Sequence, residues 1–460
     1  MLPQIIQAGM GIGVSNWQLS SVAARSGALG VVSGLCLDQI LIRRLQLGDP
    51  EGHVRRALAA FPVEEIAKRI IDKFFKVKGK AEPYMQIPMQ TPEMSLERED
   101  LIVAGGFTEI FLAKEGHSGL IGVNLLEKSQ TDTLATLYGC MLAGVDYVTM
   151  GAGIPIAIPA CLDSMSRNEL TQLKLVVTGA KSTDDFKMSF DPSRFMQKAP
   201  LKRPEFLAII SSHILAMTMV KKASGKVNGF IIESPIAGGH NAPARETKEL
   251  SPSGEPIYGE KDAVNLDKMK EIGLPFWLAG GRHTHESLLE AQALGAAGIQ
   301  VGTPFLISNE SGIRSDLKAD IAKSSREVFT DPEASPTGFP FKVIQVPDTL
   351  SEKAVFEARG RVCNFGYLRE RYVKDDGSLG YRCPAEVLNA YVAKGGKAEI
   401  AKNSKCLCNA LMANIGLGNV YKDGHEEKAL LTGGSLLSKL DINEIYNVSA
   451  ADIMKKLRGI

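Results

Sequence analysis

Short apolar runs that end in Gly or Ser recur along the first two thirds of the chain, and segments that can form helices follow them. The runs are nearly continuous in Val, Ile and Leu, whereas a strand with one solvated face would alternate apolar and polar residues. They therefore predict parallel strands that are buried on both faces. We expect eight such strands, at residues 5–9, 29–33, 120–124, 146–150, 206–211, 229–233, 276–280 and 298–302.

Helical segments separate several of these strands, and the order of the elements predicts the fold class. We expect helices at residues 17–26, 133–143, 213–223, 263–272 and 284–294, the last capped by Thr284. Eight β-then-α units between residue 3 and about residue 310 predict an α/β protein with a TIM (β/α)8 barrel, whose active site lies where the strands end. A doubly wound open sheet is disfavoured, because the Gly-rich segment at 9–13 reads G-x-G-x-G and not G-x-G-x-x-G.

Three segments exceed a minimal barrel. Residues 40–117 contain charged amphipathic helical sequence and a Pro-containing loop, and they predict a helical insertion after the second strand that forms a lid, a subdomain or a contact between subunits. Residues 173–190 predict a hairpin before the fifth strand. From residue 312 the βα rhythm stops, so we expect two domains: a barrel at 1–311 and an appended, mostly helical region at 312–460.

The composition argues against several classes of protein function. The chain has 53 Lys and Arg against 52 Asp and Glu, so it lacks the basic field of a nucleic-acid-binding protein. Its longest nearly uncharged stretch, residues 140–162, contains Asp146, glycines and prolines, which favours a strand and a loop over a membrane helix. No secretory signal is visible, and 7 cysteines do not make a disulfide framework. We expect a cytoplasmic protein that acts on a small molecule and binds neither nucleic acid nor membrane.

Two glycine-rich turns follow the last two predicted strands. Gly280 and Gly281 end the seventh, and Gly302 and Thr303 end the eighth. In TIM barrels these two positions commonly bind a phosphate, because glycine lets backbone N–H groups approach closely and a hydroxyl adds a donor. The bland alternative is a pair of tight turns that need glycine for a positive φ. The coincidence of both turns favours a phosphate-bearing ligand.

A histidine after the sixth strand is the best candidate for proton transfer. His240 follows Gly238 and Gly239, and the unperturbed pKa of histidine near 6.5 makes both of its forms accessible at neutral pH. His283 and His285 do not share a helical face, so we do not expect a metal pair there. Four late cysteines, at 363, 383, 406 and 408, do not have the usual zinc spacing, and buried thiols are the preferred interpretation over zinc or an iron–sulfur cluster.

Together these pieces resemble the nitronate monooxygenase (2-nitropropane dioxygenase-like) family of FMN-dependent barrels. The resemblance covers about residues 4–307 and rests on the ordered segments QAGMGIG, GVNLLEK, AGGH, LAGG and IQVGTPFL. It implies that FMN lies over the carboxyl ends of the strands and that His240 handles a proton. The FMN-binding residues it implies are Met10, Gly11, Asn124, Gly238, Gly239, Gly280, Gly281, Gly302 and Thr303, with Ser211 or Ser212, and preferably Ser212, after the fifth strand.

The chain departs from the family pattern at two places. The family commonly has Glu directly before AGGH, whereas this chain has Ile236, which would remove a carboxylate from the rim of the site. The first segment reads QAGM where QAPM or QGGM is more usual. These departures and the segments outside the barrel bear more on the substrate than on the cofactor.

Three functions are compatible with this sequence. The first is oxidation of an alkyl nitronate by FMN and O2 to a carbonyl compound and nitrite, which the resemblance favours. The second is an FMN-dependent enoyl-thioester reductase that uses NAD(P)H, since such enzymes share AGGH and the phosphate turns. The third is a flavin-binding scaffold without catalysis, which the presence of His240 disfavours.

Overall fold

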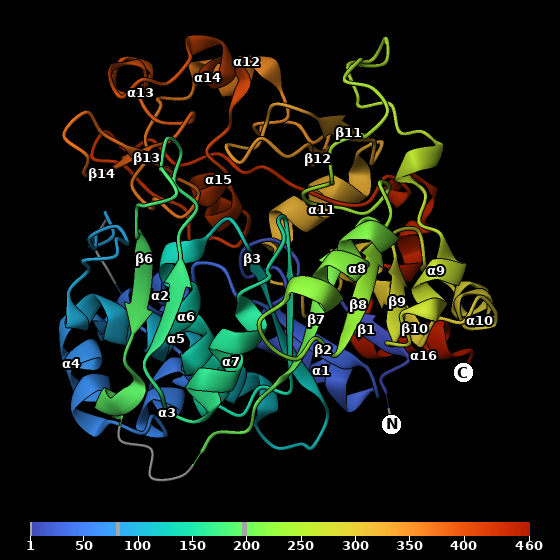
Figure 1. Ribbon diagram of the computed structural model, residues 1–460, viewed down its shortest axis with the longest axis horizontal. Coiled ribbons are helices and arrows are strands. Elements are labelled where there is room, and N and C mark those ends of the chain that lie inside the picture. The colour runs from blue at the N-terminus through green and yellow to red at the C-terminus, as the bar shows by residue number, and fades with distance from the viewer. Residues whose placement is uncertain (1, 80–82, 196–199) are drawn as a thin grey trace.

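The computed structural model describes residues 2–79, 83–195 and 200–460. In this part of the chain, eight parallel strands form a closed barrel in the order β1-β10-β9-β8-β7-β4-β3-β2 (Figure 1). Each predicted strand is present, within two residues at either end. The predicted TIM barrel is confirmed. The strands are β1 (Ile5–Gln7), β2 (Leu29–Ser33), β3 (Ile121–Leu126), β4 (Tyr147–Gly151), β7 (Glu205–Ile210), β8 (Gly229–Glu233), β9 (Phe276–Ala279) and β10 (Gly298–Val301).

The amino-terminal half of the barrel is a packed apolar core. One cluster joins side chains from six of the eight strands, among them Ile6, Val31, Leu207 and the fully buried Trp277. The indole N–H of Trp277 donates to the backbone oxygen of Pro3 at 2.7 Å, so the one polar atom of this side chain is satisfied. Because this half is filled, a ligand can enter only from the opposite end of the strands.

Helices surround the barrel, and the last one comes from the far end of the chain. After β10 no helix follows directly; instead α16 (Ala450–Arg458) packs against both α1 and α10. It takes the place of the helix that would follow β10 in the ring, although it begins about 150 residues after β10 in the sequence. The other helices of the ring are α1 (Trp17–Arg25), α5 (Leu96–Lys114), α6 (Gln130–Leu142), α7 (Ile158–Ser166), α8 (His213–Lys222), α9 (Leu266–Glu271) and α10 (His285–Ala293).

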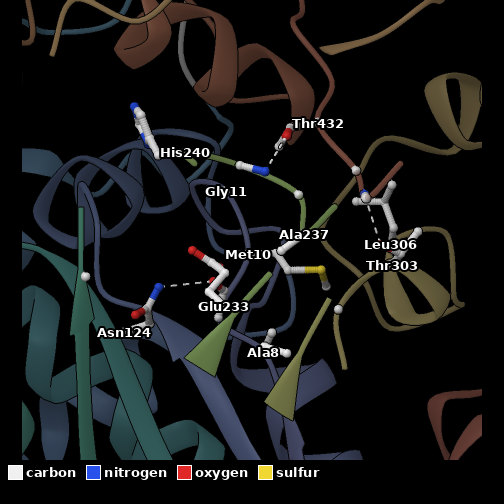
Figure 2. Close-up of a pocket in the computed structure, with 18 of the residues that line it drawn as sticks. Ala8, Met10, Gly11, Asn124, Glu233, Ala237, His240, Thr303, Leu306 and Thr432 are labelled. Carbon is white, nitrogen blue, oxygen red and sulfur yellow. Dashed lines mark hydrogen bonds between the residues drawn. The ribbon is translucent and has the colours of Figure 1, made fainter. Parts of the chain in front are cut away.

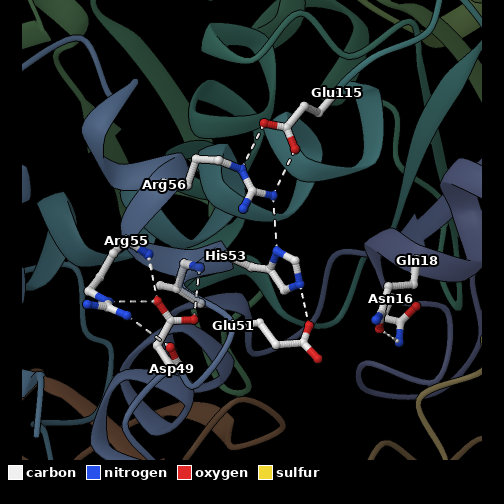
Figure 3. A network of polar contacts seen from close by, with 9 residues as sticks. Asn16, Gln18, Asp49, Glu51, His53, Arg55, Arg56 and Glu115 are labelled. Carbon is white, nitrogen blue, oxygen red and sulfur yellow. Dashed lines mark hydrogen bonds and ion pairs between the residues drawn. The ribbon is translucent and has the colours of Figure 1, made fainter. Parts of the chain in front are cut away.

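The insertion after β2 is helical, as predicted, and it builds the outer wall of the barrel. It contains α2 (Leu37–Gln46), α3 (His53–Ala59) and α4 (Glu64–Phe74), and all three pack against α5. Polar contacts hold α3 at its amino end (Figure 3): the carboxylate of Asp49 accepts the backbone N–H groups of Val54 and Arg55, at 3.1 and 3.0 Å. Arg56 forms an ion pair with Glu115 at 2.8 Å.

Of the other two extra segments, the predicted hairpin packs against α6 and α7, and the region after β10 lies at the carboxyl ends of the strands. The predicted hairpin is confirmed: β5 (Thr171–Lys174) pairs antiparallel with β6 (Lys187–Phe190). The region after β10 contains short helices, as expected, and also two antiparallel strand pairs that the sequence pattern did not predict. Its elements are α11 (Ser315–Lys323), β11 (Val328–Asp331), β12 (Phe341–Ile344), α12 (Lys353–Ala358), β13 (Glu370–Val373), β14 (Leu379–Arg382), α13 (Leu388–Ala393), α14 (Ala398–Asn403) and α15 (Leu407–Asn414).

Figure 1 shows this region above the barrel, and we call residues 328–440 the cap. The division of the chain into two domains at residue 311 stays a prediction, because α16 returns from the cap to the barrel wall. Among the described helices, none combines the length and the hydropathy that crossing a bilayer requires.

Candidate functional site

A cavity lies between the carboxyl ends of the barrel strands and the cap (Figure 2). Nine of the expected FMN-binding residues and His240 line it, although they come from five different strand ends. Ser212 does not line the cavity: its hydroxyl caps α8 by accepting the backbone N–H of Leu215 at 3.2 Å. The residues brought together are Met10, Gly11, Asn124, Gly238, Gly239, His240, Gly280, Gly281, Gly302 and Thr303.

The two glycine turns lie side by side, because β9 and β10 are neighbours in the barrel. Gly280 and Gly281 have φ values of +92° and +70°, a conformation that glycine adopts without strain. Within the described part of the chain, no acceptor is bonded to the backbone N–H of Gly281, Gly302 or Thr303. N–H groups that converge without a protein acceptor form an anion-binding site.

The cap contributes a third glycine turn that the sequence analysis missed. Gly434 donates its backbone N–H to the hydroxyl of Thr303 at 3.0 Å, and the hydroxyl of Thr432 accepts the N–H of Gly239 at 2.9 Å (Figure 2). A Cβ on Gly434 would lie 2.8 Å from the Thr303 oxygen, which explains the glycine. Paired glycines in Thr432-Gly433-Gly434 were the available signal, but nothing in the sequence indicated that they return to β10.

The turn that follows β1 fits closely around Asn124. The side-chain N–H2 of Asn124 donates to the backbone oxygen of Gly9 at 3.2 Å, and its oxygen accepts from Thr149 at 2.9 Å. A Cβ on Gly9 would lie 2.5 Å from the Cβ of Asn124, so glycine is required there. The amide is thus held in one orientation at the cavity wall. One of its two N–H bonds remains for a ligand.

His240 is held by the cap. Its Nε2 lies 2.7 Å from the hydroxyl of Ser335, and its ring contacts the ring of Phe341 edge-on with centroids 4.9 Å apart. Burial lowers the pKa of His240 to about 4, so the imidazole is neutral at neutral pH. Nδ1 has no hydrogen-bond partner among the described residues. A neutral imidazole with one free nitrogen can position a substrate or accept a proton.

Glu233, at the end of β8, is a second titratable group that the sequence analysis missed. It lines the cavity, and Figure 2 shows its carboxyl group between Asn124 and Met10. Burial raises the pKa of Glu233 to about 8, so at neutral pH the carboxyl is mostly protonated and can donate a hydrogen bond. The expectation that Ile236 removes the carboxylate from the rim was therefore wrong. A carboxyl group is retained three residues earlier, where the strand alternation turns it into the cavity.

Few charged groups line the cavity near the glycine turns after β9 and β10. Arg282 lines the cavity beside Gly281, and its guanidinium forms an ion pair with Glu290 at 2.6 Å. In the described part of the chain, no three His, Cys, Asp or Glu side chains are arranged to hold a metal ion. The site therefore offers backbone N–H donors, the neutral imidazole of His240 and the neutral carboxyl group of Glu233, with Arg282 and His283 also in its lining.

The family model described as nitronate monooxygenase matches residues 179–332, which include AGGH and the glycine turns after β9 and β10. The resemblance to nitronate monooxygenases is confirmed. A probable nitronate monooxygenase of Staphylococcus saprophyticus is 32% identical over 127 residues, or 27% of this chain and 34% of that protein. The chain thus spans about a third of the length of the curated relative that it matches.

Two solved structures show the same fold. FabK from Thermotoga maritima has a TM-score of 0.50 at 16% identity, and the match covers 99% of this chain and 91% of FabK. Nitroalkane oxidase from Streptomyces ansochromogenes has a TM-score of 0.50 at 13% identity, with 99% of this chain and 95% of that chain covered. At these identities the likeness concerns the barrel architecture.

Proposed function

We propose that this protein is an FMN-dependent oxidoreductase that oxidises alkyl nitronates with O2 to a carbonyl compound and nitrite. The observation that carries the proposal is the convergence of two glycine turns with free N–H groups beside His240, at the open end of the barrel. The match of residues 179–332 to the nitronate monooxygenase model supports it, because that match contains these same motifs.

The residues present fit FMN. The N–H groups of Gly281, Gly302 and Thr303 would hold its phosphate, and the glycines leave room that a Cβ would fill. Met10 and Gly11 would lie beside the ring system, and the free N–H of Asn124 would bind its polar edge. When bound, FMN supplies the redox chemistry, accepting electrons from the substrate and returning them to O2.

The chain's own groups would bind and orient the substrate. A nitronate carries negative charge on its two oxygens, and a neutral Glu233 offers an O–H donor where an ionised carboxylate would repel the anion. His240 is neutral, so its unbonded Nδ1 would orient the nitronate or handle a proton during turnover. Apolar cap residues would exclude water from this space; they include Leu368, Leu407, Leu411 and Phe341.

Two parallel assays test the proposal. The purified protein is first examined for flavin absorption, and it is then mixed with alkyl nitronates in air without nicotinamide while oxygen and nitrite are measured. Consumption of oxygen with release of nitrite is expected. A second mixture contains NAD(P)H and a crotonyl thioester. Turnover in the second mixture alone would replace nitronate oxidation by enoyl-thioester reduction, and a protein that binds no flavin would contradict both.

A further inference from the structure

One side of the cavity is apolar, and two distant parts of the chain build it. Two of its residues come directly before α2, and the others belong to the cap. All of them also belong to one hydrophobic cluster, so they form a continuous surface. We call this surface the apolar arm, and its residues are Leu35, Cys36, Leu368, Leu407, Cys408 and Leu411.

No residue of the apolar arm carries a charge. Burial raises the pKa of the thiols of Cys36 and Cys408, so both stay neutral at neutral pH. Tyr367 lines the cavity next to Leu368, but its hydroxyl already donates to the carboxylate of Asp38. A ligand gains here by burying apolar surface, whereas a charged group would lose its hydration without finding a partner.

Phe341 joins the apolar arm to His240. It lines the cavity and belongs to the same hydrophobic cluster, and its ring contacts the ring of His240 with centroids 4.9 Å apart. Figure 2 shows His240 and Thr303 on opposite sides of the cavity. A substrate that reacts beside His240 can therefore extend into the arm, away from the turns that would hold the phosphate of FMN.

The apolar arm lies outside the part of the chain that matches the nitronate monooxygenase model. That match covers residues 179–332, whereas the arm consists of residues 35 and 36 and of cap residues from 368 to 411. Leu407 and Leu411 are one turn apart on α15, so they project from the same face of that helix. The arm is thus a feature of segments that bear on the substrate and not on the phosphate turns.

We propose that the apolar arm binds the hydrocarbon chain of the substrate and makes the protein select nitronates with long unbranched alkyl chains. This inference rests on the proposed nitronate oxidation. The nitronate group would lie beside His240 and Glu233, and its chain would lie against Leu407 and Leu411 of α15. Each methylene group that the arm buries favours binding about threefold to fourfold, so preference rises with chain length until the arm is full.

A homologous series of substrates tests the selectivity of the flavin-loaded protein. We measure kcat/KM for the nitronates of nitroethane, 1-nitrobutane, 1-nitrohexane and 3-nitropropanoate. We expect kcat/KM to rise at least about 10-fold from nitroethane to 1-nitrohexane. The nitronate of 3-nitropropanoate should be a poorer substrate than that of 1-nitrobutane, because its chain ends in a carboxylate. Equal values along the series, or a preference for the carboxylate, would overturn the proposal.

Variants at the wall of the arm test which residues select the chain. Leu368 is half-buried at the cavity wall, so Leu368→Trp narrows the arm. It should lower kcat/KM for the hexane nitronate at least about 10-fold more than for the ethane nitronate. Leu411→Ala widens the arm and should shift the preference toward longer chains. The matched control is Leu388→Trp, at a cap position that is 40% exposed, and it should keep the wild-type profile.

Binding of saturated carboxylates separates a failure of the arm from a failure of the proposed function. A carboxylate resembles a nitronate in shape and charge but does not react, and calorimetry measures the Kd of propanoate and hexanoate for the flavin-loaded protein. Tighter binding of hexanoate that Leu368→Trp abolishes, without oxidation of any nitronate, would contradict the nitronate chemistry and leave the arm as a site for apolar chains. Oxidation of all nitronates with no effect of chain length or of Leu368→Trp would overturn the arm alone.

Discussion

Glu233 and His240 are two buried titratable groups in one cavity, and burial shifts them in opposite directions. It raises the pKa of Glu233 to about 8 and lowers the pKa of His240 to about 4, because it disfavours the charged form of each. Both side chains are therefore neutral over most of the range from pH 4 to pH 8. A site of this kind binds and orients a small anion through hydrogen bonds rather than through a fixed charge.

Because the pKa of Glu233 is raised, replacing this residue should increase the free energy of unfolding by an amount that depends on pH. Because the folded-state pKa, about 8, exceeds the ordinary value of 4.5, the folded protein holds more protons than the unfolded chain between these values, and its stability falls as pH rises through them. We expect Glu233→Gln to match the wild type near pH 4.5 and to exceed it by about 3–5 kcal/mol at pH 8. Urea unfolding of the flavin-free proteins at several pH values measures this difference.

The titration of His240 gives stability the opposite dependence on pH, and it serves as an internal check on the direction of the Glu233 effect. Its folded-state pKa, about 4, lies below the ordinary 6.5, so its contribution is complete above pH 6.5 and is lost as pH falls toward 4. A stability difference between Glu233→Gln and wild type that is independent of pH would show that Glu233 is ionised in the folded protein.

Substitution of His240 tests its part in turnover. If the imidazole transfers or positions a proton, His240→Ala should lower kcat by about 10²–10⁴-fold without loss of bound flavin, because the ring contacts the cap through Ser335 and Phe341. Steady-state kinetics and the flavin spectrum are measured together. His425→Ala, at an exposed position, should leave both unchanged. An unaltered kcat in His240→Ala would exclude the residue from the reaction.

At the level of elements, the turns after β9 and β10 differ in whether a side chain can replace the hydrogen of their glycines. Gly281 has a φ of +70°, so any side chain there is strained. Gly302 has a φ of −119°, and a Cβ on it would meet Met10 at 3.4 Å and Ala8 at 3.5 Å, which is ordinary contact. A methyl group at Gly302 would therefore leave the fold intact and lie against Met10 and Ala8, two residues that line the cavity.

This difference makes Gly302→Ala a selective test of the phosphate site. We expect it to raise the Kd for FMN at least about 10-fold, since it adds a methyl group to the turn that would hold the phosphate and would disturb charge-assisted hydrogen bonds worth about 1.5–3 kcal/mol each. Titration of FMN fluorescence with the apoprotein measures Kd. The control is Gly360→Ala, where a Cβ has no neighbour within 4 Å. Equal FMN affinity in both variants would place the phosphate elsewhere.

For the whole molecule, the cap and the barrel form one connected structure. The chain leaves β10, builds the cap, and returns as α16 to fill the space between α1 and α10. The buried face of α16 includes Met454 and Leu457, which are 0% and 1% exposed and belong to the main barrel core. The helix α16 thus stabilises two helices of the barrel wall that lie far from it in the sequence.

We expect Leu457→Ala to destabilise the whole molecule by about 2–5 kcal/mol, because it opens a cavity in the barrel core. Ile400→Ala, on the cap surface with 53% exposure, should change stability by less than about 0.5 kcal/mol. Urea unfolding is followed by tryptophan fluorescence, which reports on Trp277 inside the barrel and on Trp17 of α1. If the fluorescence transition of Leu457→Ala coincides with that of the wild type, α16 does not support the barrel.

The sequence alone predicted the barrel strands, and ten of the eleven residues that it suggests for the site line one cavity. Buried parallel strands carry continuous apolar runs, and turns that need glycine carry it, so both are encoded locally and can be read along the chain. Ser212 caps α8 and does not line the cavity, and a serine that caps a helix looks the same in sequence as a serine that binds a ligand. Only the tertiary structure revealed the carboxyl group of Glu233 in the cavity, the Thr432–Gly434 turn and the fixing of His240 by Ser335. Each of these depends on contacts between residues far apart in the chain or on the direction of one side chain, and neither property leaves a periodic pattern.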